Sequence, residues 1–120
     1  MKNIGIVSLG LIGGSILKGL NETDKYKIFA YTSNKNTVNE LKNYKNVTAV
    51  SSLEELKNCE LVFVCSPINK TVEMIKTVSN SVNKNCIVCD VASLKTDIIE
   101  NCKNLPCKFI STHPMAGTEK

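Results

Sequence analysis

Apolar residues along this chain occur in short runs that alternate with segments of helical spacing. The first run, Ile4–Val7, is broken by small residues, and apolar side chains then recur at helical spacing through Leu20. A buried strand produces such a run, and an amphipathic helix produces such a spacing. The beginning of the chain therefore predicts a strand, a tight turn and a helix.

The same alternation continues through the rest of the chain. Further strand-like runs lie at residues 25–31, 47–50, 61–65, 86–90 and 108–111. Helices are expected between them, at residues 36–44, in a short segment with a capping-box pattern from residue 51, after residue 67, and at 94–102. The run 61–65 is apolar throughout, which is typical of a central parallel strand. This order predicts an α/β fold with a doubly wound parallel sheet.

The first turn carries a pattern close to the Rossmann fingerprint G-x-G-x-x-G, with Ser8, Gly10 and Gly13 at its three positions. Gly10 has no side chain to keep a diphosphate from the free N–H groups at the helix start, where Leu11 and Ile12 follow. Ser8 replaces the first glycine. A serine can make the turn if its φ stays negative, but the backbone freedom of glycine is lost. The loop predicts a dinucleotide site, and the alternative is a glycine-rich turn that binds nothing.

The end of the second predicted strand bears on the choice of cofactor. In this fold an acidic residue there binds the ribose of NAD, whereas a small polar residue with a nearby cation accommodates the 2′-phosphate of NADP. Here Thr32, Ser33 and Lys35 supply hydroxyl groups and a cation but no carboxylate. These residues favour NADP, and the alternative is a polar loop that caps the next helix.

Other candidate residues follow later strands. Cys65, Ser66 and Pro67 end the run 61–65 and are expected to line the cofactor crevice, because parallel sheets bind ligands at the carboxyl ends of their strands. His113 follows the last strand, where neutral imidazole can accept a hydroxyl proton while hydride leaves the same carbon. Ser93 can orient His113 or the substrate hydroxyl. The alternatives are a histidine held in a loop and a serine that caps a helix.

Composition narrows the class of protein. The 120 residues suffice for one domain but are too few for the two that most dinucleotide enzymes need, so we expect a domain to be missing. The 15 basic residues, all lysines, are scattered against 11 acidic ones, which argues against nucleic-acid binding. The sequence shows neither an apolar run of membrane-spanning length nor a signal-peptide pattern, so we expect a cytoplasmic protein.

Six cysteines lie between residues 59 and 107. Those inside apolar runs are expected to be buried free thiols. Cys86 and Cys89 have C-x-x-C spacing, but positions three apart on a strand point to opposite faces, so we predict no metal site.

Four segments together resemble the nucleotide domain of the prephenate and arogenate dehydrogenases: VSLGLIGGS, VFVCSPI, DVASLK and, above all, THPMAGTEK. The resemblance covers the whole chain and implies oxidative decarboxylation of prephenate or arogenate with NAD(P). It implies that His113 accepts the proton of the ring hydroxyl, that Ser93 bonds the same hydroxyl, and that Glu119 shapes the substrate entrance. Hydride passes to the nicotinamide while the ring carboxylate leaves as CO2.

The resemblance also implies what residues 1–120 lack. Relatives have a second, mostly helical domain that makes a homodimer and supplies the arginine for the substrate carboxylates, and this chain contains no arginine. We therefore expect the 120 residues to bind cofactor with little or no turnover. Two alternatives stay open. One is another β-hydroxyacid or imino-acid oxidoreductase, and the other is a dinucleotide-sensing module without chemistry.

Overall fold

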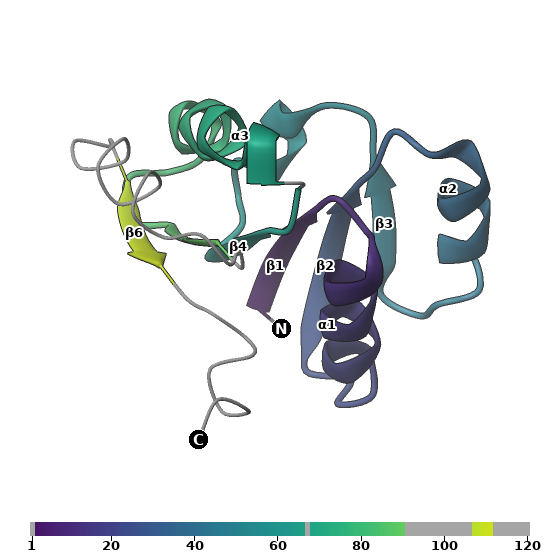
Figure 1. Cartoon of the computed structure of the whole chain (residues 1–120). Coiled ribbons are helices and arrows are strands. Elements are labelled where there is room, and N and C mark those ends of the chain that lie inside the picture. Colours follow the sequence, from purple (N-terminus) through teal and green to yellow (C-terminus); the bar gives the residue numbers. More distant parts are fainter. Residues whose placement is uncertain (1, 67, 91–106, 112–120) are drawn as a thin grey trace, which may run out of the picture.

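In the computed structural model, six parallel strands form one sheet (Figure 1). The model describes residues 2–66, 68–90 and 107–111. The strand order is β3-β2-β1-β4-β5-β6, which is typical of dinucleotide-binding domains. The strands are β1 Lys2–Val7, β2 Tyr26–Tyr31, β3 Val47–Val50, β4 Leu61–Val64, β5 Ile87–Asp90 and β6 Lys108–Ser111.

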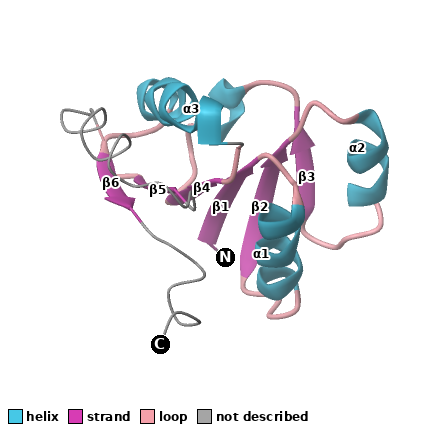
Figure 2. Ribbon diagram, in the orientation of Figure 1, coloured by secondary structure: helices cyan, strands magenta, loops and turns pink. Residues whose placement is uncertain are grey.

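The described helices cover the two faces of the sheet differently (Figure 2). Helices α1 (Leu11–Asn21) and α2 (Lys35–Leu41) contact β1, β2 and β3. On the opposite face, the 3-10 helix η1 (Leu53–Leu56) and helix α3 (Ile68–Ser81) pack over the middle of the sheet. The chain reverses its winding direction after β3, and right-handed crossovers then place the later connections on the second face.

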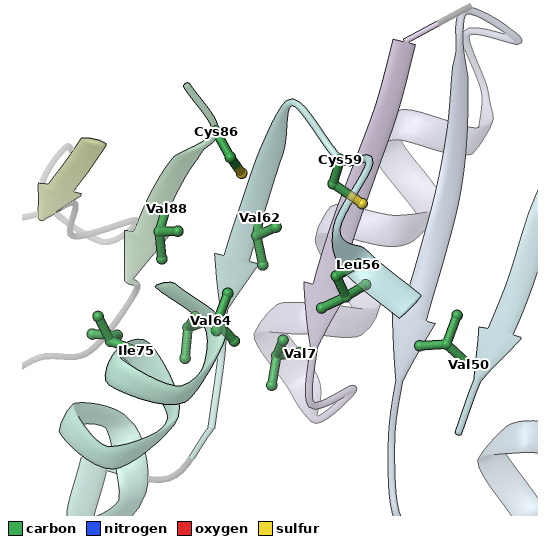
Figure 3. Packing of buried hydrophobic residues seen from close by; sticks show 10 residues of the cluster. Val7, Val50, Leu56, Cys59, Val62, Val64, Ile75, Cys86 and Val88 are labelled. Carbon is green, nitrogen blue, oxygen red and sulfur yellow. The ribbon is translucent and has the colours of Figure 1, made fainter. Parts of the chain in front are cut away.

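The core is divided by the sheet into two clusters. Figure 3 shows the larger one, where the side chains of Val7, Val62, Val64 and Val88 meet Ile75 of α3. All five of these side chains are fully buried. The smaller cluster joins α1 and α2 to the other face through Ile6, Leu17, Ile28, Ala30 and Leu41. Apolar side chains on both sides of β1 account for the uninterrupted apolar run at the start of the chain.

The strands all end on one line across the sheet. The register pairs Val50 with Tyr31, Tyr31 with Val7 and Val7 with Val64. It continues from Val64 to Asp90 and Ser111. The loops that leave these strands therefore start side by side along the carboxyl edge of the sheet.

The predicted doubly wound parallel sheet is confirmed, with small differences at element ends. The helix expected over 36–44 ends at Leu41, and the segment from residue 51 forms only the 3-10 turn η1. The Glu55 side chain accepts hydrogen bonds from the backbone N–H groups of Ser51 and Ser52, which lower the pKa of Glu55. The helix expected at 94–102 lies outside the described residues.

None of the described helices has the length and apolar character needed to cross a lipid bilayer.

Candidate functional site

The candidate site lies at the carboxyl edge of the sheet, where the loops that follow the neighbouring strands β1 and β4 diverge. From these neighbouring strands the chain winds in opposite directions, and open α/β sheets form their ligand-binding crevice where two such loops diverge. The Ser8 N–H donates to the Tyr31 carbonyl (2.8 Å), and the Cys65 N–H donates to the Val7 carbonyl (2.9 Å). These bonds extend the sheet by one residue beyond β1 and β4 and fix the start of both loops.

Gly13 is the point of closest approach between α1 and the sheet. A Cβ atom added to Gly13 would lie 2.3 Å from the Ser8 carbonyl oxygen and 3.4 Å from Cys65 Cβ. The first distance is far inside van der Waals contact, so only glycine fits. This is the close helix–strand packing that the fingerprint assigns to its third position.

Gly10 has the opposite environment. A Cβ atom added to Gly10 would meet no heavy atom within 4 Å. Gly10 precedes α1 with extended backbone and makes no side-chain cap, and its carbonyl accepts the N–H of Gly14 (2.9 Å). The N–H groups of the first helical turn have no carbonyl partner within the helix. The exposed Leu11 and the partly exposed Ile12 follow directly.

Ser8 does not meet the condition under which a serine makes this turn without strain. Its φ is +72°, in the left-handed region, and not negative. The turn must bring the Ser8 carbonyl to Gly13 while α1 starts three residues later, at Leu11, and this geometry requires the conformation that glycine adopts freely. Ser8 therefore holds a strained backbone, at a cost of about 1–2 kcal/mol for a residue with a Cβ atom.

Replacing Ser8 with glycine should stabilise the chain. Relief of the left-handed strain exceeds the extra backbone entropy that glycine loses on folding, which leaves a net gain of about 0.5–1 kcal/mol. Urea unfolding followed by circular dichroism measures the gain. Asn46→Gly is the matched control, because Asn46 also has a positive φ (60°) but asparagine tolerates it. A destabilised Ser8→Gly chain would show that the serine side chain makes a compensating interaction.

The loop after β2 is partly engaged in local structure. The N–H of Asn34 donates to Thr32 Oγ1 (3.2 Å), and Asn34 Oδ1 accepts from two backbone N–H groups of the first turn of α2 (2.9 and 3.2 Å). For Thr32 and Asn34, these bonds agree with the alternative given above, a polar loop that caps the next helix. Ser33 and Lys35 are exposed at the same edge as the glycine loop.

Ser66 lies across the crevice from the glycine loop. It is 9% exposed, and its carbonyl accepts the Thr71 hydroxyl of α3 (3.1 Å). Within the described part of the chain, the buried Ser66 Oγ has no hydrogen-bond partner. Buried hydroxyl groups normally have one, because an unmet bond costs about 1–3 kcal/mol.

Asp90, at the end of β5, is a candidate site residue that the sequence analysis did not name. It is fully buried, two strands from β1 on the line where all strands end. Burial of a carboxylate is costly, so an aspartate there points to a specific polar environment at this edge. The only sign of it in the sequence is that one acidic residue ends the otherwise apolar run 86–90.

The remaining predicted site residues, Pro67, Ser93, His113 and Glu119, lie outside the described residues. The register places the last described residue of β6, Ser111, beside Asp90. His113 follows Ser111 by two residues in the sequence.

The described cysteines are free thiols, and burial raises their pKa values. The pKa rises to about 11 for Cys59 and to about 12 for Cys65 and Cys86. Cys86 packs in the cluster beneath α3, and the pleat turns Cys89 to the other face, as the strand reading predicts. At neutral pH these thiols are protonated and poorly reactive. Cys102 lies outside the described residues.

Comparison with known proteins agrees with this geometry. Residues 18–120 match the family model for the prephenate dehydrogenase nucleotide-binding domain. A prephenate dehydrogenase of Lactococcus lactis subsp. cremoris is 28% identical over 128 aligned positions, which cover all of this chain and 36% of that protein. The glycine loop precedes the region matched by the family model.

Solved structures show the same similarity. The prephenate dehydrogenase from A. aeolicus, in complex with hydroxyphenyl propionate and NAD+, is 28% identical over the whole chain and 44% of its own length, with a TM-score of 0.83. The Synechocystis arogenate dehydrogenase is 28% identical over 98% of this chain and 42% of its own, with a TM-score of 0.77. The chain thus spans less than half the length of these relatives. It belongs to the prephenate dehydrogenase family and corresponds to its nucleotide-binding domain.

Proposed function

We propose that this chain binds NAD(P) across the crevice between β1 and β4, with the pyrophosphate at the start of α1. The observation that carries the proposal is the contrast between Gly13, which packs tightly on Ser8, and Gly10, which faces open space. An open glycine at a helix start leaves room for a ligand phosphate to approach the free N–H groups of the first turn. The NAD+ in the A. aeolicus relative supports this assignment.

The residues present fit the cofactor. Leu11 and Ile12 offer exposed apolar surface beside the phosphate position, and the buried Ser66 Oγ across the crevice is available for a hydrogen bond. Ser33 and Lys35, exposed after β2, favour the 2′-phosphate of NADP over the bare ribose of NAD. Thr32 contributes by holding this loop through its bond from the Asn34 N–H.

In the intact protein, we propose the oxidative decarboxylation of prephenate or arogenate. The bound nicotinamide supplies the hydride acceptor. His113 accepts the proton of the ring hydroxyl, and Ser93 hydrogen-bonds the same hydroxyl and orients it. Glu119 shapes the substrate entrance. The names of the relatives and the HPMAG segment support these roles.

We further propose that turnover requires a second, mostly helical domain that makes a homodimer and supplies an arginine for the substrate carboxylates. Such a domain accords with the length of the relatives, of which this chain spans less than half. The 120 residues alone then bind nucleotide without normal dehydrogenase activity.

A fluorescence titration of the 120-residue chain with NADPH and, separately, NADH tests nucleotide binding. We expect saturable binding with a preference for NADPH. Gly10→Ala should weaken it about tenfold or more, because a methyl group then occupies the place of the pyrophosphate, and 1.4 kcal/mol of clash is a factor of ten. The fold should persist, since that methyl group meets nothing in the free chain.

Gly19→Ala is the matched control for this titration. A Cβ atom there also meets no atom within 4 Å, but Gly19 lies near the far end of α1, so binding should not change. A folded chain that binds neither nucleotide, and that Ser8→Gly does not restore, would contradict the proposal. Equal binding of both nucleotides would remove only the NADP preference.

A further inference from the structure

A cavity of about 240 Å³ lies between helices α1 and α2. Figure 1 shows α2 on the β3 side of α1, and both helices pack mainly on the sheet. Among the described residues, those that line the cavity come from α1, from α2 and from the turns beside them, and none comes from β4 or the loop after it. The cavity thus adjoins the glycine loop at Gly10 but extends from it towards α2, away from the crevice between β1 and β4.

The two helices turn matching stripes of residues to the cavity. In each stripe the residues are spaced i, i+3, i+4 and i+7, which places them on one face of a helix. A Cβ atom added to Gly14, in the stripe of α1, would meet no heavy atom within 4 Å, so the missing side chain helps to keep the space open. The stripes are Leu11, Gly14, Ser15 and Lys18 on α1, and Thr37, Glu40, Leu41 and, just past its end, Tyr44 on α2.

The cavity combines an apolar floor with a charged rim. The buried Leu17 and Leu41 and the half-buried Leu9 supply the apolar surface. Lys18 and Glu40 line the same cavity and are exposed to solvent. A ligand that places an apolar group inward and charged groups outward would complement both parts.

The two charged residues stand on opposite walls and are not paired with each other. Lys18 belongs to α1 and Glu40 to α2, and within the described part of the chain neither one makes an ion pair. The space between them can therefore take a molecule that carries both charges. Its carboxylate would meet the Lys18 ammonium group, and its ammonium group would meet the Glu40 carboxylate.

The volume limits the size of this ligand. A water molecule takes about 30 Å³ in the liquid, so 240 Å³ corresponds to about eight water molecules. Sites for cofactors and drug-sized ligands usually measure about 300–1,000 Å³, so the cavity is too small for a dinucleotide. A free amino acid of about the size of leucine fits this space.

We propose that the cavity between α1 and α2 binds a free α-amino acid with an aliphatic side chain. The Lys18 ammonium group donates to its carboxylate, and the Glu40 carboxylate accepts from its ammonium group. The aliphatic side chain packs on Leu17 and Leu41. The inference does not rest on nucleotide binding, because the site can be titrated without any nucleotide.

Isothermal titration calorimetry of the 120-residue chain with L-leucine, in the absence of nucleotide, tests the proposal. We expect saturable binding at one site. The analogue 4-methylpentanoate lacks the ammonium group of leucine, and 3-methylbutylamine lacks its carboxylate. Each analogue should bind about tenfold more weakly, because one charged hydrogen-bonding partner is lost.

Two variants assign the charged ends of the ligand. In Glu40→Gln, L-leucine should bind about tenfold more weakly, and no more tightly than 4-methylpentanoate. In Lys18→Met the same relation should hold between L-leucine and 3-methylbutylamine. Both positions are exposed, so the variants should fold. The matched controls Glu73→Gln and Lys76→Met make the same changes of charge at exposed positions of α3 and should leave binding unchanged.

A third variant tests where the ligand lies. The side chain added in Gly14→Leu enters the cavity and should abolish binding. Gly19→Leu is its control, because a Cβ atom at Gly19 is equally free of neighbours but Gly19 lies near the far end of α1, and it should bind L-leucine normally. If Gly14→Leu does not fold by circular dichroism, Thr37→Leu fills the cavity from α2 instead.

Three outcomes would overturn the proposal. A folded chain that does not bind L-leucine has only a solvent-filled groove between these helices. Equal binding of L-leucine and its two analogues would mean apolar adsorption without recognition of the charges. Normal binding by a folded cavity-filling variant would place the ligand elsewhere on the chain.

Discussion

Replacing Gly13 with alanine should destabilise the domain by about 3 kcal/mol or more, because the new Cβ atom would stand 2.3 Å from the Ser8 carbonyl oxygen. That oxygen belongs to backbone held by the bond from the Ser8 N–H to Tyr31 and cannot rotate away as a side chain would. Either α1 moves off the sheet or the turn deforms. Urea unfolding monitored by circular dichroism measures the loss.

Gly14 gives a matched control for this prediction. It is the next residue of the same helix, and a Cβ atom on it meets nothing within 4 Å. Gly14→Ala should therefore raise stability by about 0.5–1 kcal/mol, since alanine favours helix. Similar stabilities of the two variants would show that α1 does not pack on Ser8 as described.

Replacing His113 with asparagine in the intact enzyme should lower kcat by about 10²- to 10⁴-fold, the range that a positioned proton acceptor contributes. Asparagine keeps a hydrogen-bonding side chain of similar size but does not accept the proton of the ring hydroxyl. Steady-state kinetics with prephenate and with arogenate measure the loss.

Nucleotide binding is the control for the His113 variant. The dissociation constant for the nucleotide should stay unchanged, which separates lost chemistry from a damaged fold. Unchanged turnover would exclude the proposed role of His113 and favour a β-hydroxyacid-type oxidoreductase that does not need it.

The sequence predicts the architecture well because the sheet is parallel and buried. Runs such as 61–65 have no polar face, and the right-handed crossover rule converts alternating strands and helices into one layered order. The close packing of Gly13 against the sheet also follows from its position in the glycine fingerprint. The predictions that succeed are those for which one local pattern permits only one packing.

Local sequence patterns do not predict backbone strain or contacts between distant elements. The sign of φ at Ser8 depends on where Gly13 stops α1 against the sheet, which is a contact between two elements. The burial of Asp90 depends on neighbours from other strands, and a single aspartate at a strand end is equally compatible with a solvated turn.

The central position of β1 has a consequence for how the chain folds. Its partner on one side, β2, follows closely, but its partner on the other side, β4, begins at Leu61, which pairs with Ile4. During synthesis the first strand thus keeps one unpaired edge until residues 61–64 have been made. Because such distant pairing costs loop-closure entropy and slows folding, the nascent domain is exposed to aggregation until β4 docks.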